Sequence, residues 1–212
     1  MQKIFVSGID TNIGKTVAAG WLARNFMAQG KSVITQKLIQ TGCVGISEDI
    51  LAHRKIMGVG ILPEDSDSTT CKYVLRFPSS PHLACRLENV KLDLRSIAEN
   101  TEKLARKFDV VIIEGAGGLM VPLTEHVLTS DYIKENDLQV ALVVSSRLGS
   151  LNHALLSLEY CLKKPLKLYG IVYNTYPKAD KEIEDSTRDY LKAYLEKNFP
   201  GAKFLEMDKL EF

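Results

Sequence analysis

The stretch Ser7-Gly8-Ile9-Asp10-Thr11-Asn12-Ile13-Gly14-Lys15-Thr16 decides the fold of this chain. It follows the apolar run Ile4-Phe5-Val6, which is typical of a strand, and precedes a helical pattern from Val17 to Ala28. A strand, a glycine-bearing turn and a helix start together form a phosphate-binding loop, because backbone N–H groups and the helix dipole meet the anion there. In such loops the lysine (Lys15) reaches the β- and γ-phosphates, and the next hydroxyl (Thr16) binds magnesium. The sequence therefore predicts a nucleotide-binding loop, with one residue more between its two glycines than the standard spacing.

Composition indicates a globular protein. The chain has 212 residues, of which 45% are hydrophobic and 25% charged, and its formal net charge is +1. One α/β domain over residues 1–212 is expected. The absence of a basic run disfavours a nucleic-acid partner, and no apolar run is long enough to span a bilayer. The first strand leaves no room for a secretory signal, and the four cysteines have no paired spacing. We therefore expect a cytoplasmic protein without nucleic-acid or membrane partners.

Apolar runs alternate with helical patterns along the chain. Strands are predicted at Lys3–Ser7, Ser32–Lys37, Asp109–Glu114, Gln139–Ser145 and Lys167–Tyr173. Helices are predicted at Lys15–Gln29, Glu48–Met57, Leu94–Lys107, Leu151–Lys163 and Ala179–Asn198. This alternation predicts a three-layer, doubly wound α/β fold with a mostly parallel sheet, like that of P-loop NTPases. The segment from Gly58 to Pro81 is expected to cross over the site.

Functional residue types follow the predicted strands at their carboxyl ends, where such sheets bind ligands. Glu114 ends an apolar strand, as a Walker-B acid does when it assists magnesium, and the glycines behind it (115–118) allow close approach to a phosphate. Lys37 ends the second strand, where it would face the γ-phosphate. The alternative for Lys37 is a solvated lysine at a strand end. Asn174 closes the fifth strand in the same way.

Four further features have a structural as well as a functional interpretation. Asp49 follows Ser47, which could cap a helix and give the neighbouring acids a purely structural role. His82 could donate to a substrate, although a lone histidine is more often a capping or satisfied residue. His53 is expected to pack or to face solvent. The Asn152-His153 pair begins another helix and is interpreted as a cap by default.

Together these motifs resemble those of the dethiobiotin synthetase family, ATP-dependent enzymes of biotin synthesis. The resemblance extends from Lys3 to about Asn174. The matching motifs are Gly8-x-Asp10-Thr11-x-x-Gly14-Lys15-Thr16, Lys37 with Thr41-Gly42, Ser80-Pro81-His82, Glu114-Gly115-Ala116-Gly117-Gly118 with Pro122-Leu123, and Leu148-Gly149-x-x-Asn152-His153-Ala154. The family shares the longer loop spacing.

The resemblance implies a role for each matching residue. Magnesium would be held by Thr16, Asp49 and Glu114. ATP would be bound by Asn12, Ile13, Gly14, Lys15, Thr16, Val17, Asp49, Glu114, Gly115, Ala116, Gly117, Asn174 and Thr175. Catalysis would depend on Lys37, Lys15 and Thr11. The substrate would contact Thr41, Ser80, Pro81, Gly149, Ser150, Asn152 and His153, and the last four of these would reach the neighbouring subunit's site in a homodimer.

The resemblance also implies the reaction. An amine of 7,8-diaminononanoate captures carbon dioxide as a carbamate, and the carbamate oxygen attacks the γ-phosphate of ATP. The second amine then closes the ureido ring while phosphate leaves. This chemistry needs no protein nucleophile and depends on positioning and electrostatics, which suits two lysines and two or three acids.

The chain departs from the family at its end. Relatives usually carry a Gly-x-hydrophobic-Pro turn past the last strand, which packs on adenine, and residues 202–212 lack it. A looser nucleotide preference is therefore expected.

Two other ATPase classes share the looped architecture. Partition and septum-positioning ATPases carry a signature lysine at the position that Asp10 occupies here. Amide-forming ATPases that act on corrinoid acids usually continue into a glutaminase domain, for which this chain has no room. Both alternatives are disfavoured.

Overall fold

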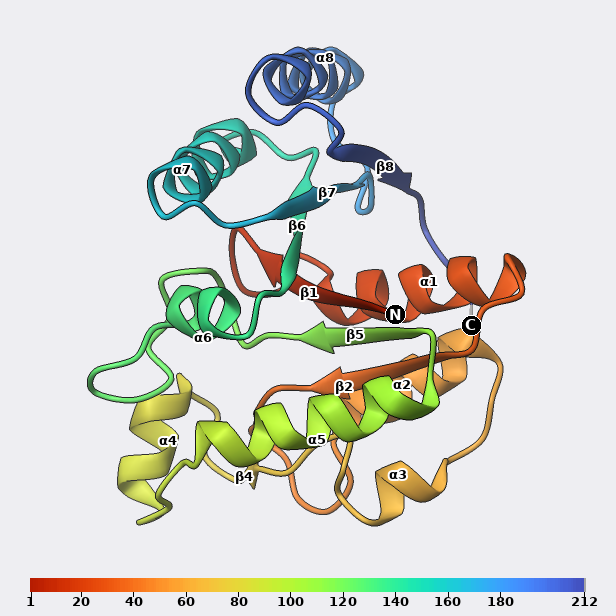
Figure 1. The fold of residues 1–212 in the computed structure, drawn as a ribbon. Coiled ribbons are helices and arrows are strands. Elements are labelled where there is room, and N and C mark those ends of the chain that lie inside the picture. The colour runs from red at the N-terminus through yellow and green to blue at the C-terminus, as the bar shows by residue number, and fades with distance from the viewer. Residues whose placement is uncertain (212) are drawn as a thin grey trace.

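Six parallel strands form the central sheet of the computed structural model, which describes residues 1–211 (Figure 1). In spatial order they are β2 (Val33–Lys37), β5 (Val110–Glu114), β1 (Gln2–Gly8), β6 (Gln139–Ser145), β7 (Leu168–Asn174) and β8 (Lys203–Met207). Every adjacent pair is parallel. The carboxyl ends of all six strands therefore lie at one edge of the sheet, and β1 lies near its middle.

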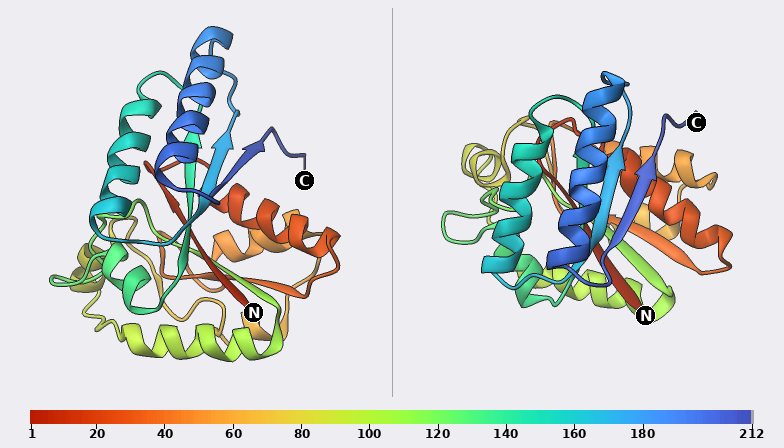
Figure 2. Two further views of the ribbon diagram at one scale, coloured as in Figure 1. Left: turned by 45° about the horizontal axis from the view of Figure 1, so that its top comes forward. Right: turned by 90° about the horizontal axis from the view of Figure 1, so that it is seen from above.

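Helices cover both faces of the sheet (Figure 2). One face packs against α1 (Lys15–Ala28) and α2 (Glu48–Met57). The other face packs against α5 (Leu94–Lys107), α6 (Thr129–Glu135), α7 (Ser150–Lys163) and α8 (Lys181–Asn198). Shorter elements cross the end of the sheet near β2, namely β3 (Gln40–Thr41), α3 (Pro63–Ser66), β4 (Val74–Leu75) and α4 (Pro81–Leu87). The result is the predicted three-layer α/β fold.

The central strand β1 shows why the buried strands are apolar without alternation. Ile4 and Val6 pack on the α1 side, and Phe5 packs on the opposite side. All three side chains are fully buried. Successive strand residues point to opposite faces, so a strand covered on both faces must be apolar throughout.

Helices α1 and α2 pack closely because of one glycine. A Cβ atom on Gly20 of α1 would lie 2.9 Å from Ile56 of α2. Any larger residue at position 20 would push the helices apart. Thr16 lies in the first turn of α1 and Asp49 in the first turn of α2, so this contact helps to set the distance between these two side chains.

The predicted elements are confirmed, with boundaries that differ by no more than two residues. The sequence interpretation did not include β8 or α6. The segment from Gly58 to Pro81 contains α3 and β4 rather than loops alone, and Pro81 begins α4.

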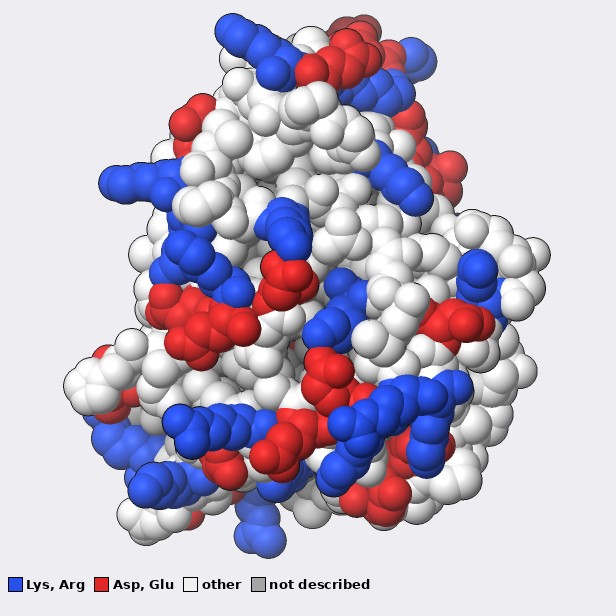
Figure 3. Space-filling model, viewed as in Figure 1, with Lys and Arg blue, Asp and Glu red and all other residues white. Residues whose placement is uncertain are grey.

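Basic and acidic side chains are intermingled on the face shown in Figure 3. Within residues 1–211, no helix combines the length and the hydrophobicity that a membrane span requires.

Candidate active site

The loop between β1 and α1 wraps around the start of α1. Gly14 takes the N-cap position with φ +97°, and a Cβ atom there would lie 2.6 Å from the side-chain nitrogen of Asn174. The loop is closed on itself, because Nζ of Lys15 donates to the carbonyl of Asp10 at 2.8 Å. No side chain caps α1. The first N–H groups of α1 therefore remain available to an anion, as a phosphate-binding loop requires.

A charged cluster lies directly behind this loop. Lys37 is buried, and its Nζ lies 2.5 Å from Asp49 Oδ2 and 2.8 Å from Glu114 Oε1. The Lys37 ammonium also donates to the carbonyl of Gly115 at 3.2 Å. The hydroxyl of Thr16 lies 3.1 Å from Asp49 Oδ1 and 3.0 Å from Glu114 Oε1. The structure thus brings the predicted lysine, hydroxyl and both predicted acids into one group.

Three elements position this cluster. Lys37 and Glu114 are register partners at the carboxyl ends of β2 and β5. Asp49 lies in the first turn of α2, where the Ser47 hydroxyl accepts a hydrogen bond from the N–H of Ile50 at 3.3 Å. The predicted cap at Ser47 is therefore present, and the same turn also carries Asp49 into the site.

Electrostatics keep the cluster charged despite its burial. Burial alone would raise the pKa of Glu114, but the Lys37 charge and a hydrogen bond from His53 lower it to about 2. Burial would lower the pKa of Lys37, and the carboxylates of Glu114 and Asp49 outweigh it, so the pKa is raised. The pKa of Lys15 is lowered by burial, and the Lys37 charge acts in the same direction. The Glu114 carboxyl group is therefore ionised at neutral pH, where it stabilises the Lys37 ammonium.

The lowered pKa of Glu114 predicts an acid-labile stability in the ligand-free protein. A carboxyl group whose pKa is lower in the folded than in the unfolded protein stabilises the native state at pH values above its unfolded pKa, here 4.5. This contribution to the free energy of unfolding is lost as the pH falls toward the folded pKa of about 2. We expect the free energy of unfolding of the wild type to fall more steeply across this window than that of Glu114→Gln, as measured by urea denaturation. Glu135→Gln, at an exposed glutamate, is the control and should keep the wild-type slope. Equal slopes for wild type and Glu114→Gln would contradict the prediction.

The oxygen atoms of Thr16, Asp49 and Glu114 lie together and are of the type that magnesium binds. Magnesium prefers oxygen and typically binds one or two carboxylates, with waters and substrate phosphates completing the shell. Among residues 1–211, no three or more His, Cys, Asp or Glu side chains form a self-sufficient metal cluster. The residues therefore suit a magnesium ion that arrives with a nucleotide.

A cavity of about 1300 Å³ opens in front of the cluster. The predicted residues that line it are Thr11, Asn12, Gly14, Lys15, Thr16, Val17, Lys37, Thr41, Asp49, Ser80, Pro81, Glu114, Ala116 and Gly117. Lining residues that were not predicted include Ile39, Met120, Val121, Leu156, Ser157 and Tyr160. The unpredicted group is largely apolar, so the cavity wall combines charged and apolar side chains.

Several predicted residues do not line this cavity. Ile13 points its side chain into the core, and its carbonyl accepts from Asn174 Nδ2 at 3.0 Å. Gly115 contributes only its carbonyl, which bonds to Lys37. The predicted substrate residues Gly149, Ser150, Asn152 and His153 are not among the lining residues of their own chain's cavity. Gly149 lines a separate small groove between α7 and α8.

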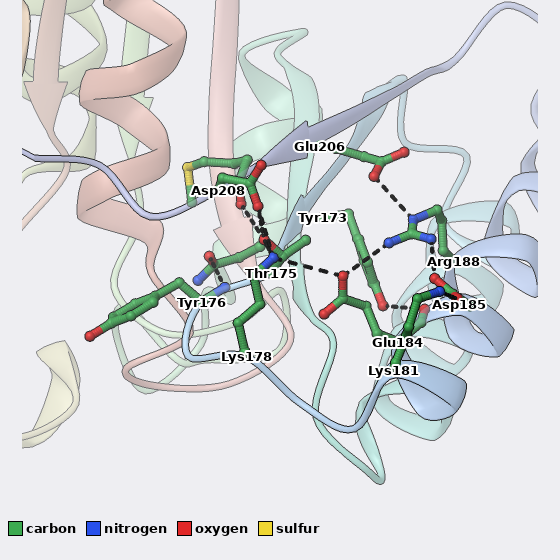
Figure 4. Close-up of polar contacts among 12 residues, drawn as sticks. Tyr173, Thr175, Tyr176, Lys178, Lys181, Glu184, Asp185, Arg188, Glu206 and Asp208 are labelled. Carbon is green, nitrogen blue, oxygen red and sulfur yellow. Dashed lines mark hydrogen bonds and ion pairs between the residues drawn. The ribbon is translucent and has the colours of Figure 1, made fainter.

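Asn174 and Thr175 lie beside the loop, next to the end of β8. Asn174 is 7% exposed, and its Oδ1 also accepts from the N–H of Tyr176 at 3.1 Å. Thr175 contacts Asp208, which also pairs with Lys178 at 3.1 Å (Figure 4). The end of β7 is thereby tied to the end of β8.

The sequence interpretation expected His53 to pack or to face solvent and gave it no role in the site. This residue is fully buried, and its Nε2 lies 2.8 Å from Glu114 Oε2. The signal that could have found it is its spacing, since His53 follows Asp49 by four residues and therefore shares its helix face.

Comparison with known proteins identifies similar sequences. A family model described as an AAA domain matches residues 2–200. The chain is 50% identical over 206 residues to an ATP-dependent dethiobiotin synthetase of Haemophilus ducreyi, covering 97% of this chain and 98% of the relative. It is 48% identical over 209 residues to one from Pasteurella multocida, covering 98% of each. A third, from Chlorobaculum tepidum, is 48% identical over 196 residues, covering 92% of this chain and 82% of the relative.

Solved structures resemble the fold. A putative plasmid partition protein of Borrelia burgdorferi, bound to AMPPNP, matches with a TM-score of 0.59 at 14% identity, covering 99% of this chain and 87% of the other. The signal recognition particle receptor FtsY of Elizabethkingia anophelis matches with a TM-score of 0.55 at 15% identity, covering 100% of this chain and 59% of the other. At these identities the likeness concerns the fold alone.

Proposed function

The chain belongs to the ATP-dependent dethiobiotin synthetase family, and from this premise we propose how its residues divide the work. It is an ATP-dependent ligase of biotin biosynthesis. It uses ATP to carboxylate 7,8-diaminononanoate and to close the ring, giving dethiobiotin, ADP and phosphate. The observation that supports the residue assignment best is the meeting of Lys37, Thr16 and two carboxylates behind the phosphate-binding loop.

Two lysines are proposed to act on the reacting groups. Lys15 must leave the carbonyl of Asp10 to reach the β- and γ-phosphates. Lys37 faces the end of the cavity where the carbamate oxygen and the γ-phosphate would meet, and its charge opposes the negative charge that develops there. Thr11 lines the same cavity and is proposed to assist the two lysines.

Thr16, Asp49 and Glu114 are proposed to hold magnesium once the nucleotide is bound. The ion supplies charge neutralisation to the β- and γ-phosphates. A bound ion would share the charge of the two carboxylates with Lys37, whose ammonium is proposed to contact the substrate.

Two groups of lining residues are proposed to divide the substrate. Thr41, Ser80 and Pro81 line the cavity and are proposed to contact the reacting part of the substrate. The apolar lining residues Met120 and Leu156 suit the alkyl chain of 7,8-diaminononanoate.

A homodimer is proposed to complete this site. The segment from Gly149 to His153 lies away from its own chain's cavity, as expected of residues that serve a neighbouring subunit. Two variants that are each inactive, Lys37→Ala and Asn152→Asp, should then regain activity when unfolded together and refolded as a mixture. Some mixed dimers would combine one intact cavity with one intact segment, so up to about a quarter of wild-type turnover is expected from random pairing of subunits. A mixture that stays as inactive as its components would contradict shared sites.

The site is proposed to discriminate only weakly between the bases of different nucleotides. The side chain of Asn174 uses one N–H on Ile13 and one lone pair on Tyr176, so only one N–H and one lone pair of its amide remain to read a base. We expect kcat/KM with CTP and with GTP to lie within about tenfold of the value with ATP, since one net hydrogen bond contributes about 1 kcal/mol. The measurement is kcat/KM for the three nucleotides at fixed diamine. A preference for ATP above about a hundredfold would contradict this proposal.

Residues 1–212 are proposed to act as one ATPase-type domain in the cytoplasm, where ATP is available. The deciding assay is phosphate release from ATP with bicarbonate, with and without 7,8-diaminononanoate. Release that depends strongly on the diamine supports the synthetase. Release that is independent of the diamine and stimulated by DNA or membranes would indicate a molecular switch instead.

A further inference from the structure

His53 lies behind Glu114, on the side away from the cavity. Its ring is fully buried, with Nε2 2.8 Å from Glu114 Oε2 and Nδ1 3.0 Å from Thr35 Oγ1. Neither His53 nor Thr35 lines the cavity. The reaction proposed above uses neither residue, yet His53 contacts a proposed magnesium ligand directly.

The hydrogen-bond network assigns the direction of the bond between His53 and Glu114. Arg54 has only donors, so its Nη1 donates to Thr35 Oγ1 at 2.8 Å. The Glu114 carboxylate has only acceptors, so the hydrogen of the bond between His53 and Glu114 belongs to Nε2. Nε2 of His53 therefore donates to Oε2 of Glu114, while Nδ1 faces the Thr35 hydroxyl.

Arg54, at the far end of this hydrogen-bond network, is held in place by Asp65. Arg54 donates to both oxygens of Asp65, at 2.8 and 2.7 Å, and both side chains are buried. Asp65 also accepts from the Thr70 hydroxyl at 2.8 Å. The backbone carbonyl of Thr70 in turn accepts from the N–H of Lys37 at 2.8 Å. The segment between α2 and β4 is thereby fixed to the end of β2.

We propose that His53 is a positioning residue that holds one oxygen of Glu114 and leaves the other for the magnesium site. Oε2 accepts the His53 hydrogen bond, whereas Oε1 faces Thr16 and Lys37. The terminal torsion of a glutamate is broad and roughly two-fold, so the carboxylate needs such a contact to keep one orientation. Partners behind a metal ligand commonly tune metal affinity in this way. The inference depends on the proposed magnesium role of Glu114.

Two variants at position 53 test the two hydrogen bonds of the His53 ring separately. In His53→Gln, the longer amide reaches the position of Nε2 and can still donate to Glu114. In His53→Asn, the shorter amide reaches the position of Nδ1 and contacts Thr35 but not Glu114. We expect His53→Asn to weaken Mn²⁺ binding about 10- to 100-fold in the presence of ADP, measured by electron paramagnetic resonance, and His53→Gln to keep it within about threefold. Equal weakening in the two variants, or none in either, would overturn the proposal.

A second measurement needs no change at position 53. The chain has four histidines, and replacing His82, His126 and His153 with glutamine leaves His53 alone. In the ¹⁵N spectrum of this protein we expect a hydrogen on Nε2. An Nε2 atom without a hydrogen would overturn the proposal even if both position-53 variants failed to fold. Should wild-type protein with ADP bind no Mn²⁺, the magnesium role of Glu114 would fail, while the spectrum would still decide the direction of the bond.

Discussion

Replacing Lys37 with alanine is expected to lower kcat by about two to three orders of magnitude, the cost typical of removing a group that stabilises transition-state charge. The Lys37 ammonium is the cation nearest to both Asp49 and Glu114, and it lines the cavity where the phosphoryl group would be transferred. The measurement is phosphate release at saturating ATP, bicarbonate and diamine, on protein whose folding has been checked by circular dichroism. KM for ATP should change less than kcat, because the lysine acts mainly on charge that develops during the reaction.

The Lys37→Ala variant is also expected to lose stability, so its folding and its activity must be measured separately. Without Lys37, two carboxylates face each other, and removing one partner of a buried ion pair typically costs about 3–5 kcal/mol. Added magnesium and ATP should restore much of that loss, since a divalent cation replaces the missing charge. Lys167→Ala removes the lysine from the exposed pair with Asp137 and should leave kcat unchanged. Near-normal turnover of Lys37→Ala would remove Lys37 from the proposed active site.

Replacing Thr16 with valine is expected to lower kcat by about a hundredfold or more and to raise the magnesium concentration needed for half-maximal activity. Valine keeps the shape of the side chain and removes its hydroxyl, which lies 3.1 and 3.0 Å from the two acids. The metal would then lose one ligand while the loop backbone stays intact. The measurement is turnover as a function of magnesium at fixed ATP.

Thr16→Ser is the matched control, because it keeps the hydroxyl and loses only a methyl group. We expect it to stay within about fivefold of the wild type in kcat. If valine and serine reduced turnover equally, the hydroxyl would have no special role, and packing at the start of α1 would explain the loss instead.

The fold could be predicted because its buried strands and long helices have strong local patterns. β5, for example, is fully buried and apolar up to Glu114, and α2 begins at a Ser47 cap that the sequence already indicated. The convergence of Lys37 and Glu114 also followed from the sequence, since parallel strands end at the same edge.

The missed elements have weak local patterns. β8 pairs only with β7 and carries Lys203 and Glu206, as exposed edge strands often do, so it did not resemble the buried strands. α6 has seven residues, which is too few for a clear helical period.

His53 was missed for a different reason. Sequence periodicity places it on the same helix face as Asp49, but it does not indicate that Glu114, 61 residues later, lies within hydrogen-bond distance. Thr35 and Arg54 complete the network from two other positions. Only the packing of α2 against β2 and β5 brings these side chains together.

Because β8 follows the other five strands of the central sheet in the chain, it leaves the ribosome after them. Met207, near its end, would lie 3.9 Å from a Cβ atom on Gly14 in the nucleotide-binding loop, and the Thr175 N–H donates to its carbonyl at 3.0 Å. A nascent chain that stops before this strand leaves the β7 edge unpaired and the loop without this neighbour. Synthesis of β8 thus pairs the β7 edge and places Met207 beside the loop in a single step, so products terminated before it should be open to proteolysis and deprived of the protection that bound ATP gives.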